Sequence, residues 1–522
     1  MDSIKQRLYR DRYKLLVIIV LAGIMLLTMV KTLRHPVSDL VGTSVRGYDL
    51  SFLKPVTIAL FGILIGGFLF LCYRIKRLKV EQIFLCMGIL FGVLYMVVLP
   101  PFTTPDEAVH VDTTYYYSSK ILGQQAVDEN GYVLYRSDDA LYNHDDQHIP
   151  TVQSYASLYH NLFKMDHSDG TVNFLRAPLS VSAIAYVPQI IGVTLARLFH
   201  LGNIQMLLWG RMFAMAFYLL CLYWAIKIAP IGKELLMVVA LMPTTLQMAV
   251  SFSYDSTVLA LCFLYTGVLL YLTLEAKRVT WHHIVLLALL FAWAAPAKLV
   301  YICLAFTLLI IPTEKFANKY FKYISIAGII LAGVIVILLT RFQTVVAIGA
   351  SDGGMLAEQT TYSLSYLLHN PSKILAIFYG TIIGQGTYYL ETMIGQYLGW
   401  LEIILPGYIV YGFYTLIILS AIRKVSEKHV LSAGQRLWIF LVIAGVSVLV
   451  GAALLFDWTP IESNYVYGVQ GRYFLPMLPL LMILCKNYQI EMKESMTRYI
   501  AVALYVLQYL TVYHVYVTII GR

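Results

Sequence analysis

The chain has 522 residues, of which 59% are hydrophobic and 13% are charged, and its formal net charge is +9. Soluble domains carry a much larger charged fraction, so this composition excludes an ordinary soluble protein. The apolar runs are continuous rather than alternating, which argues against a β-barrel, and basic inner loops account for the positive charge without nucleic-acid binding. We therefore expect an all-α polytopic membrane protein that lies in a lipid bilayer and has no nucleic-acid partner.

Two membrane spans are predicted within residues 1–80, and they form an N-terminal extension. The N-terminus and the stretch at 74–79 are rich in Lys and Arg, which places both on the inner face of the membrane. A third span at 81–99 then carries the chain to the outer face and opens the core of the protein.

Residues 100–200 are predicted to form a large external loop with helices lying on the membrane surface. The apolar stretch at 179–199 is interpreted as one of these juxtamembrane helices, because a spanning helix there would move the later basic clusters to the outer face. Asp145, Asp146 and His148 are residue types that hold divalent metals, but they lack a clear ligand spacing and a solvated loop explains them more simply.

The core extends over residues 81–490, and a C-terminal span follows at 491–522. Pro296 divides the apolar stretch at 284–307 into two short helices. The Gly- and Tyr-rich stretch at 374–398 is interpreted as a re-entrant segment. The remaining predicted spans lie at residues 211–228, 235–252, 256–274, 324–339, 403–419, 438–456 and 474–484. Together these segments give a bundle of about thirteen spans.

Two carboxylates and a histidine, Asp106, Glu107 and His110, directly follow the third span. On a helix, Asp106 and His110 lie one turn apart on the same face. A carboxylate at the rim of a membrane can act as a general base toward an acceptor hydroxyl. The alternative is a plain helix start, in which Thr104 is the N-cap and Pro105 the first helical residue.

Three further charged residues are predicted on the same outer face as Asp106. Asp255 lies where one span ends and the next begins, and its alternative role is a helix cap. Arg472 follows two glycines at a helix start, where a guanidinium can bind phosphate, although a rim arginine can also simply reach the interface. Lys298 is a second cation that can reach the same phosphate, and interfacial anchoring is its alternative.

Aromatic and amide side chains accompany these charges. Trp and Tyr at a membrane interface usually belong to the aromatic belt, and sugar stacking on Trp400 is the alternative. The residues concerned are Tyr186 and Gln189 in the external loop, Trp400 and Glu402 before a span, and Gln470 and Tyr473 beside Arg472.

The motifs are, in chain order, Pro105-Asp106-Glu107 with His110, Tyr186 with Pro188-Gln189, Arg211, Pro243 followed by Ser251, Ser253 and Asp255, the run Gly399-Trp400-Leu401-Glu402, and Gln470-Gly471-Arg472-Tyr473 with Pro476. In this order they resemble the GT-C superfamily of polytopic membrane glycosyltransferases. The similarity is closest to the bacterial membrane proteins of the domain-of-unknown-function 2142 family. The matched elements cover residues from about 80 to 490.

The resemblance implies a GT-C-like bundle with external juxtamembrane helices in a bacterial plasma membrane, with an extracytoplasmic active site. It implies transfer of a sugar, with inversion, from a polyprenyl-phosphate-linked donor to an envelope polysaccharide, teichoic acid or lipid-linked glycan. Asp106 then matches the catalytic base, with Glu107 as its catalytic neighbour, and Arg472 and Lys298 bind the donor phosphate. The substrate-binding residues are His110, Tyr186, Gln189, Asp255, Trp400, Glu402, Gln470 and Tyr473.

The position of Asp255 helps to bind a divalent metal, Mg or Mn, in some GT-C enzymes and not in others, so no metal ligand is assigned. A flippase or transporter of lipid-linked oligosaccharides needs similar cations, but it also predicts repeated bundles and charges at mid-membrane depth. A polymerase that joins repeat units is a nearer enzymatic alternative. A scaffold of an envelope-synthesis complex predicts that Asp106 and Arg472 tolerate alanine.

Overall fold

The computed structural model describes residues 2–140, 149–165, 170–350 and 362–522. The described chain is mostly α-helical, and its strands form two-stranded pairings. Eight of the described helices are long and apolar enough to cross a membrane, as expected of an all-α multi-pass membrane protein. They are α1 (Asp2–Thr32), α3 (Leu53–Arg74), α4 (Val80–Val98), α8 (Asn203–Ile228), α11 (Asp255–Leu274), α13 (Lys319–Ala350), α17 (Ala433–Asp457) and α19 (Met496–Ile520).

Shorter apolar segments complete the bundle, and none of those described exceeds 17 residues. They are the 3₁₀ helix η4 (Ala183–Tyr186) with α7 (Val187–Leu198), α12 (Trp281–Ala294), the 3₁₀ helix η5 (Leu299–Ile310), α16 (Gly407–Ser420), and the 3₁₀ helix η7 (Gly471–Met477) with α18 (Leu478–Ile483). An α-helix rises about 1.5 Å per residue, so these segments are shorter than a hydrocarbon core of about 30 Å. The expected total of about thirteen full spans is therefore not reached within the described chain. The short α7 agrees with the juxtamembrane interpretation, and the gap between α12 and η5 confirms the break at Pro296.

The span expected at 235–252 is not continuous. The chain forms α9 (Lys233–Ala240) and α10 (Pro243–Ala249), with a bend at Leu241 and Met242 between them. Pro243 has no backbone N–H to continue the first helix, so it begins the second one. All the residues from Leu235 to Ala249 are buried, so this pair lies inside the bundle.

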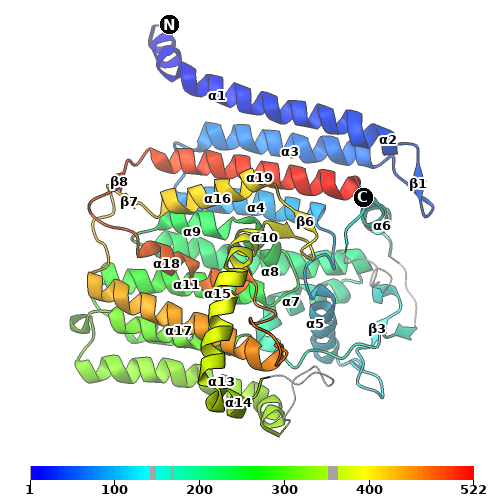
Figure 1. Ribbon diagram of the computed structural model, residues 1–522. Helices are drawn as coiled ribbons and strands as arrows, with labels where there is room; N and C mark the ends of the chain where they lie inside the picture. The colour runs from blue at the N-terminus through cyan, green and yellow to red at the C-terminus, as the bar shows by residue number, and fades with distance from the viewer. Residues whose placement is uncertain (1, 141–148, 166–169, 351–361) are drawn as a thin grey trace.

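The re-entrant segment expected at 374–398 is wrong, because α15 (Pro371–Ile394) is one continuous helix. In Figure 1 it runs across the long helices of the bundle rather than along them. It ends at Gly395, whose φ of +110° lies in the left-handed region that favours glycine. A short hairpin of β5 (Tyr397–Leu398) and β6 (Ile403–Ile404) follows.

The large external loop is built around α5 (Glu107–Ile121), which packs against α7. An ion pair and a hydrogen bond fix the loop to this helix: Arg176 Nε lies 2.5 Å from Asp112 Oδ2, and the Tyr115 hydroxyl donates to Asp139 Oδ2 at 2.6 Å. The other described elements of the loop are β3 (Tyr135–Arg136), the 3₁₀ helix η2 (Asp138–Ala140), α6 (Val152–Asn161) and β4 (Thr171–Val172). The remaining short elements are the π-helical turn η1 (Leu33–Val37), α2 (Ser38–Leu40), β1 (Ser44–Val45), β2 (Tyr48–Asp49), the 3₁₀ turn η6 (Thr313–Lys315) and α14 (Leu364–His369).

The two ends of the bundle are different. At one end, β7 (Arg423–Lys424) pairs with β8 (Glu491–Met492), and Lys424 Nζ lies 2.7 Å from Glu234 Oε1. Lys486 Nζ lies 2.9 Å from Glu427 Oε2 in the same region. The external loop with α5 lies at the opposite end, as Figure 1 shows.

Candidate functional site

Four charged side chains from distant parts of the chain meet beside α5. Lys298 Nζ lies 2.5 Å from Asp255 Oδ1, and Arg472 Nε lies 3.8 Å from Asp255 Oδ2. Arg472 Nη2 also lies 3.7 Å from Asp106 Oδ2. We call Asp106, Asp255, Lys298 and Arg472 the charged cluster. The structure thus brings together the four charged residues that the sequence placed on one face of the membrane.

Asp106 is the exposed member of the charged cluster, with 59% of its side chain accessible to solvent. Helix α5 begins at Glu107 and Asp106 is its N-cap, so the alternative of a helix start with Thr104 as N-cap and Pro105 as first residue is wrong. The Asp106 carboxylate makes no capping hydrogen bond to the described chain. Its φ of +60° and ψ of +10° are left-handed, a conformation that costs free energy for a residue with a Cβ atom. The backbone therefore holds a strained residue at the helix start, and its carboxylate faces Arg472 instead of capping the helix.

Glu107 lies in a very different environment from its neighbour, because its side chain is completely buried. Arg211 donates two hydrogen bonds to the Glu107 carboxylate, from Nε to Oε1 at 2.9 Å and from Nη2 to Oε2 at 2.6 Å. The backbone N–H groups of Phe102 and Phe252 donate to the same carboxylate at 2.9 and 3.1 Å. Both oxygens are occupied and shielded from water, so this position suits a structural clamp beneath Asp106 rather than the expected catalytic role.

His110 and two tyrosines form a buried aromatic wall beside Asp255. His110 Nδ1 and the Tyr186 hydroxyl share a hydrogen bond of 2.7 Å, and the His110 ring meets the Tyr254 ring edge-on at 5.1 Å. Burial lowers the pKa of His110 to about 3, and the nearby Asp255 carboxylate only partly offsets this. The imidazole is therefore neutral at physiological pH and adds no charge to the site.

Gln189, expected to bind substrate, is also fully buried. Its Nε2 donates to Ser256 Oγ at 3.0 Å and to the Ser253 carbonyl at 3.2 Å. These bonds tie α7 to the start of α11, so Gln189 positions the backbone around Asp255.

Lys298 does not extend outward as an interfacial anchor. Its ammonium nitrogen lies 4.3 Å from the centroid of the Tyr473 ring and 5.7 Å from that of Tyr254, in addition to its ion pair with Asp255. Tyr473 is itself held by a hydrogen bond of 2.8 Å from the Tyr301 hydroxyl to its carbonyl oxygen. Two ring faces and one carboxylate thus hold the ammonium group in place.

Arg472 is buried, but its hydrogen-bonding capacity is largely unused. Only 9% of its side chain is exposed, and its Nε has no hydrogen-bond partner among the described residues. Both of its carboxylate neighbours lie beyond 3.5 Å, Nη1 donates to the sulfur of Met248 at 3.8 Å, and the Tyr473 side chain is a further hydrogen-bonding neighbour. A buried guanidinium with free N–H groups is suited to an anion that approaches from the open side.

Gly471 allows η7, which carries Arg472, to pack closely against α15. A Cβ atom on Gly471 would lie 1.9 Å from the carbonyl oxygen of Tyr389, so only glycine lets η7 approach α15 this closely. The Gly471 N–H donates to Thr392 Oγ1 at 2.9 Å, which fixes the contact.

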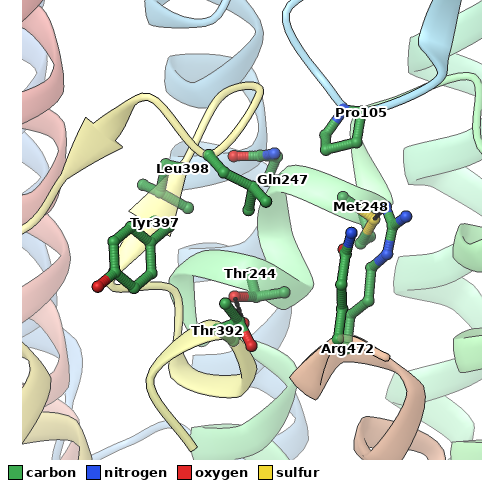
Figure 2. A pocket seen from close by; sticks show the side chains of 10 residues that line it. Pro105, Thr244, Gln247, Met248, Thr392, Tyr397, Leu398 and Arg472 are labelled. Atoms are coloured by element: carbon green, nitrogen blue, oxygen red, sulfur yellow. Dashed lines mark hydrogen bonds between the residues drawn. The ribbon is translucent and has the colours of Figure 1, made fainter. Parts of the chain in front are cut away.

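A pocket opens beside Arg472, with about 290 Å³ of empty space that includes some open to solvent. Figure 2 shows Arg472 and Met248 on one side of it, with Gln247 and Tyr397 around it. Gln470 also lines the pocket, as the sequence suggested for a substrate-binding residue. The complete lining comprises Pro105, Thr244, Gln247, Met248, Thr392, Tyr397, Leu398, Leu401, Gln470 and Arg472.

The hairpin of β5 and β6 contributes Leu401 to this pocket, while Trp400 and Glu402 are not among the lining residues. The hairpin is held by Gln247, whose Nε2 donates to the Gly399 carbonyl at 3.0 Å and whose Oε1 accepts from the Gly399 N–H at 2.9 Å. The motif Gly399-Trp400-Leu401-Glu402 therefore lies in the segment that borders the pocket, but its lining residue is Leu401 and not Trp400 or Glu402. Gln247 itself was not singled out from the sequence.

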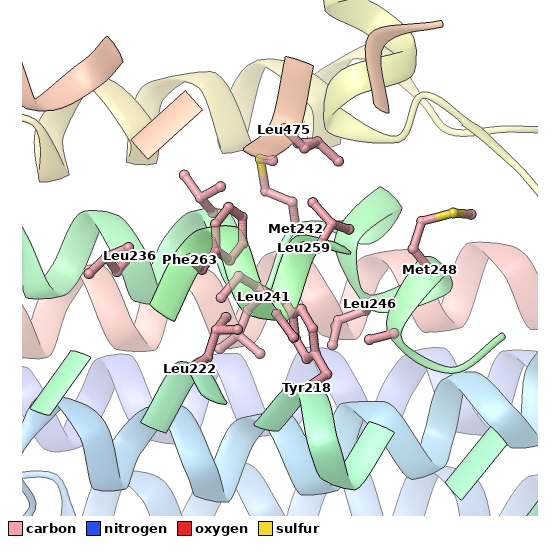
Figure 3. Close-up of a cluster of buried hydrophobic side chains, with 14 of the residues drawn as sticks. Tyr218, Leu222, Leu236, Leu241, Met242, Leu246, Met248, Leu259, Phe263 and Leu475 are labelled. Carbon is pink, nitrogen blue, oxygen red and sulfur yellow. The ribbon is translucent and has the colours of Figure 1, made fainter. Parts of the chain in front are cut away.

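The buried core continues directly beneath the site. Figure 3 shows Met248 at one end of a cluster that includes Leu241 and Met242 from the bend after α9, Leu246 from α10 and Leu475 from η7. This packing holds α10 against the helices around it, and α10 contributes Thr244, Gln247 and Met248 to the lining of the pocket.

A divalent metal does not fit the residues of the charged cluster. Both oxygens of Asp255 face a cation of the protein, and Lys298 Nζ occupies the space next to Oδ1. In the ranges that the structure describes, no group of three or more His, Cys, Asp or Glu residues is placed to hold a metal. Asp145, Asp146 and His148, the other metal candidates, lie outside the described residues.

A family model described as "Predicted membrane protein (DUF2142)" matches residues 89–481, a range that contains the whole charged cluster. Comparisons with curated proteins and with solved structures give no match.

Proposed function

The chain belongs to the DUF2142 family of predicted membrane proteins, and from the geometry of its site we propose that it is a GT-C-type membrane glycosyltransferase. It transfers a sugar from a polyprenyl-phosphate-linked donor to a cell-envelope acceptor, which is a polysaccharide, teichoic acid or lipid-linked glycan. The observation that carries the proposal is the pairing of Asp106 with Arg472 at 3.7 Å. One is an exposed carboxylate that makes no capping hydrogen bond within the described chain, and the other is a buried cation whose Nε–H has no hydrogen-bond partner there.

The proposed side of the membrane follows from charge. Lys424, Arg423 and Lys486 gather at the end of the bundle that carries β7 and β8, and basic loops normally face the cytoplasm. The charged cluster includes Asp106, the N-cap of α5, and Figure 1 shows α5 at the opposite end of the bundle. This arrangement supports an extracytoplasmic active site, and the membrane that we propose for it is a bacterial plasma membrane.

The proposed reaction is a direct displacement at the anomeric carbon of the donor sugar. An acceptor hydroxyl attacks that carbon while its proton passes to the Asp106 carboxylate. The bond between the anomeric carbon and the phosphate oxygen breaks, and its electron pair leaves with the polyprenyl phosphate. Arg472 and Lys298 stabilise the charge that develops on the leaving oxygen, and the configuration at the anomeric carbon inverts.

Residues around the charged cluster hold this geometry in place. The Glu107–Arg211 pair fixes the backbone on which Asp106 stands, and Asp255 orients Lys298. Gln470 and the rest of the pocket beside Arg472 are the proposed surroundings of the sugar.

The test is mass spectrometry of surface polymers from a deletion strain and from a strain with Asp106→Asn. Loss of one sugar substituent in both strains supports the proposal. Loss of the entire polymer favours a polymerase or flippase, and unchanged polymers in the Asp106→Asn strain favour a scaffold. Asp39→Asn is the matched control, because Asp39 has a similar side-chain exposure of 60% and pairs with His35 instead.

A further inference from the structure

Two cations of the protein lie next to the Asp255 carboxylate, and they bear on whether a divalent metal can bind there. Asp255 Oδ1 lies 2.5 Å from Lys298 Nζ, while Oδ2 lies 3.8 Å from Arg472 Nε. Only 10% of the Asp255 side chain is exposed. A carboxylate that is buried between two cations of the protein already has its charge balanced, and a divalent ion would have to displace an ammonium group to reach it.

Lys298 is held so that such displacement is costly. Its side chain is 18% exposed, and its ammonium nitrogen lies 4.3 Å from the centroid of the Tyr473 ring and 5.7 Å from that of the Tyr254 ring. A cation enclosed by two aromatic faces and one carboxylate has little freedom to swing away. Lys298 therefore provides a positive charge at a fixed place next to Asp255.

The charge balance of the cluster limits the anion that it can receive. Asp106 and Asp255 contribute two negative charges, and Lys298 and Arg472 contribute two positive ones. The nearby Glu107 is balanced by Arg211, and the buried His110 is neutral. The positive charges available to an added anion are therefore those of Arg472, whose Nε–H has no partner among the described residues, and of Lys298. One phosphodiester adds a single negative charge, whereas a diphosphate diester adds two.

We propose that the site takes its lipid donor through a single phosphate and works without a divalent metal, because Lys298 supplies the positive charge that a metal would otherwise bring. This inference rests on the proposed function, since it concerns the donor of that reaction. It selects a polyprenyl monophosphate carrier over a polyprenyl diphosphate carrier. Arg472 binds the phosphate oxygens, and Lys298 faces the oxygen that leaves with the carrier.

The experiment measures binding of carrier lipids to the full-length protein in nanodiscs by native mass spectrometry. The probes are undecaprenyl phosphate, undecaprenyl diphosphate and inorganic phosphate, each tested with EDTA and with excess Mg²⁺ or Mn²⁺. We expect undecaprenyl phosphate to bind tightest, with the same affinity under all metal conditions. We expect Lys298→Gln to weaken that binding about tenfold or more, and Lys298→Arg to retain most of it.

Lys322→Gln is the matched control, because Lys322 is a buried lysine that donates to the backbone carbonyls of Leu309 and Ile311 instead of to an acid. If Lys298→Gln proves unstable, Lys298→Arg and the metal series on the wild-type protein still decide the question. Tighter binding of the diphosphate, or an affinity that requires Mg²⁺ or Mn²⁺, overturns the inference while leaving the proposed function in place. Equal binding of inorganic phosphate, or no binding of either lipid, overturns the lipid donor and with it the proposed function.

Discussion

At the residue scale, Asp106 differs from an ordinary helix-capping residue. Capping aspartates adopt an extended backbone and accept a hydrogen bond from the first turn, whereas Asp106 is left-handed and accepts none from the described chain. The exposed carboxylate thus makes no local contribution that would compensate for its backbone conformation. Strain of this kind is concentrated at functional sites, where the surrounding structure enforces it.

The backbone strain at Asp106 can be measured with two variants that both remove the charge. We expect Asp106→Gly to be more stable than Asp106→Ala by about 1 kcal/mol, because glycine adopts a positive φ without a Cβ clash. The measurement is thermal or denaturant unfolding of both purified variants. The opposite order of stability would show that position 106 is not left-handed in the membrane.

Glu107 is expected to matter for stability more than for the chemical step. Glu107→Gln leaves Arg211 buried without a full counter-charge, which costs about 3–5 kcal/mol. Glu402→Gln, an exposed change on the β5–β6 hairpin, serves as the control and should unfold like the wild type. Thermal unfolding compares the three proteins, and equal stability of Glu107→Gln would contradict the clamp formed with Arg211.

His110 predicts a pH dependence of stability. Burial lowers its pKa from an ordinary 6.5 to about 3, so between these two values the unfolded chain binds a proton that the folded chain does not. The free energy of unfolding therefore falls as the pH drops from 6.5 toward 3, with a slope of at most about 1.4 kcal/mol per pH unit from this group. His110→Gln stays neutral, and its stability should fall less over the same range. Parallel curves for the two proteins would rule out a buried neutral histidine.

At the element scale, the approach of η7 to α15 determines where Arg472 stands. Gly471 touches the backbone of Tyr389, and the Thr392 hydroxyl accepts from its N–H. The sequence indicated that glycine permits a close approach near Arg472, but it did not indicate which element lies opposite. That element, α15, was expected to turn back on itself and instead forms one helix of 24 residues.

Gly471→Ala should shift η7 and weaken the site. The added Cβ atom would meet the Tyr389 carbonyl at 1.9 Å, and overpacking of this kind costs about 1–3 kcal/mol. Gly384→Ala on α15 is the matched control, since nothing lies within 4 Å of its Cβ position, and it should be neutral or slightly stabilising. Unfolding midpoints and binding of undecaprenyl phosphate test both variants. If the two behave alike, η7 does not depend on this contact.

Sequence patterns predicted the long apolar helices better than the short ones, for a physical reason. A run of about 20 apolar residues has few alternatives to a membrane helix. Segments such as 235–252 have the same composition, but there a proline and the surrounding bundle decide the path, and Pro243 divides the run into α9 and α10. Hydropathy alone does not contain that information.

At the scale of the whole molecule, basic loops and motifs sufficed to predict one shared face for Asp106, Asp255, Lys298 and Arg472. The structure brings their side chains within 4 Å of one another in pairs. The sequence could not predict that Asp106 is exposed while Glu107 is buried. This difference depends on Arg211, which lies 104 residues away from its partner Glu107. Likewise, only the three-dimensional arrangement shows that Lys298 already neutralises Asp255.

The central claim is that Asp106 is the base of a sugar transfer from a polyprenyl-phosphate donor. The most direct measurement is transfer by the purified full-length protein, with a polyprenyl-phosphate-linked sugar as donor and envelope polymer from the deletion strain as acceptor. The account predicts transfer by the wild type and by Asp39→Asn, and a loss of about 10²- to 10⁴-fold in Asp106→Asn, with binding of undecaprenyl phosphate retained. Full transfer activity in Asp106→Asn would contradict it.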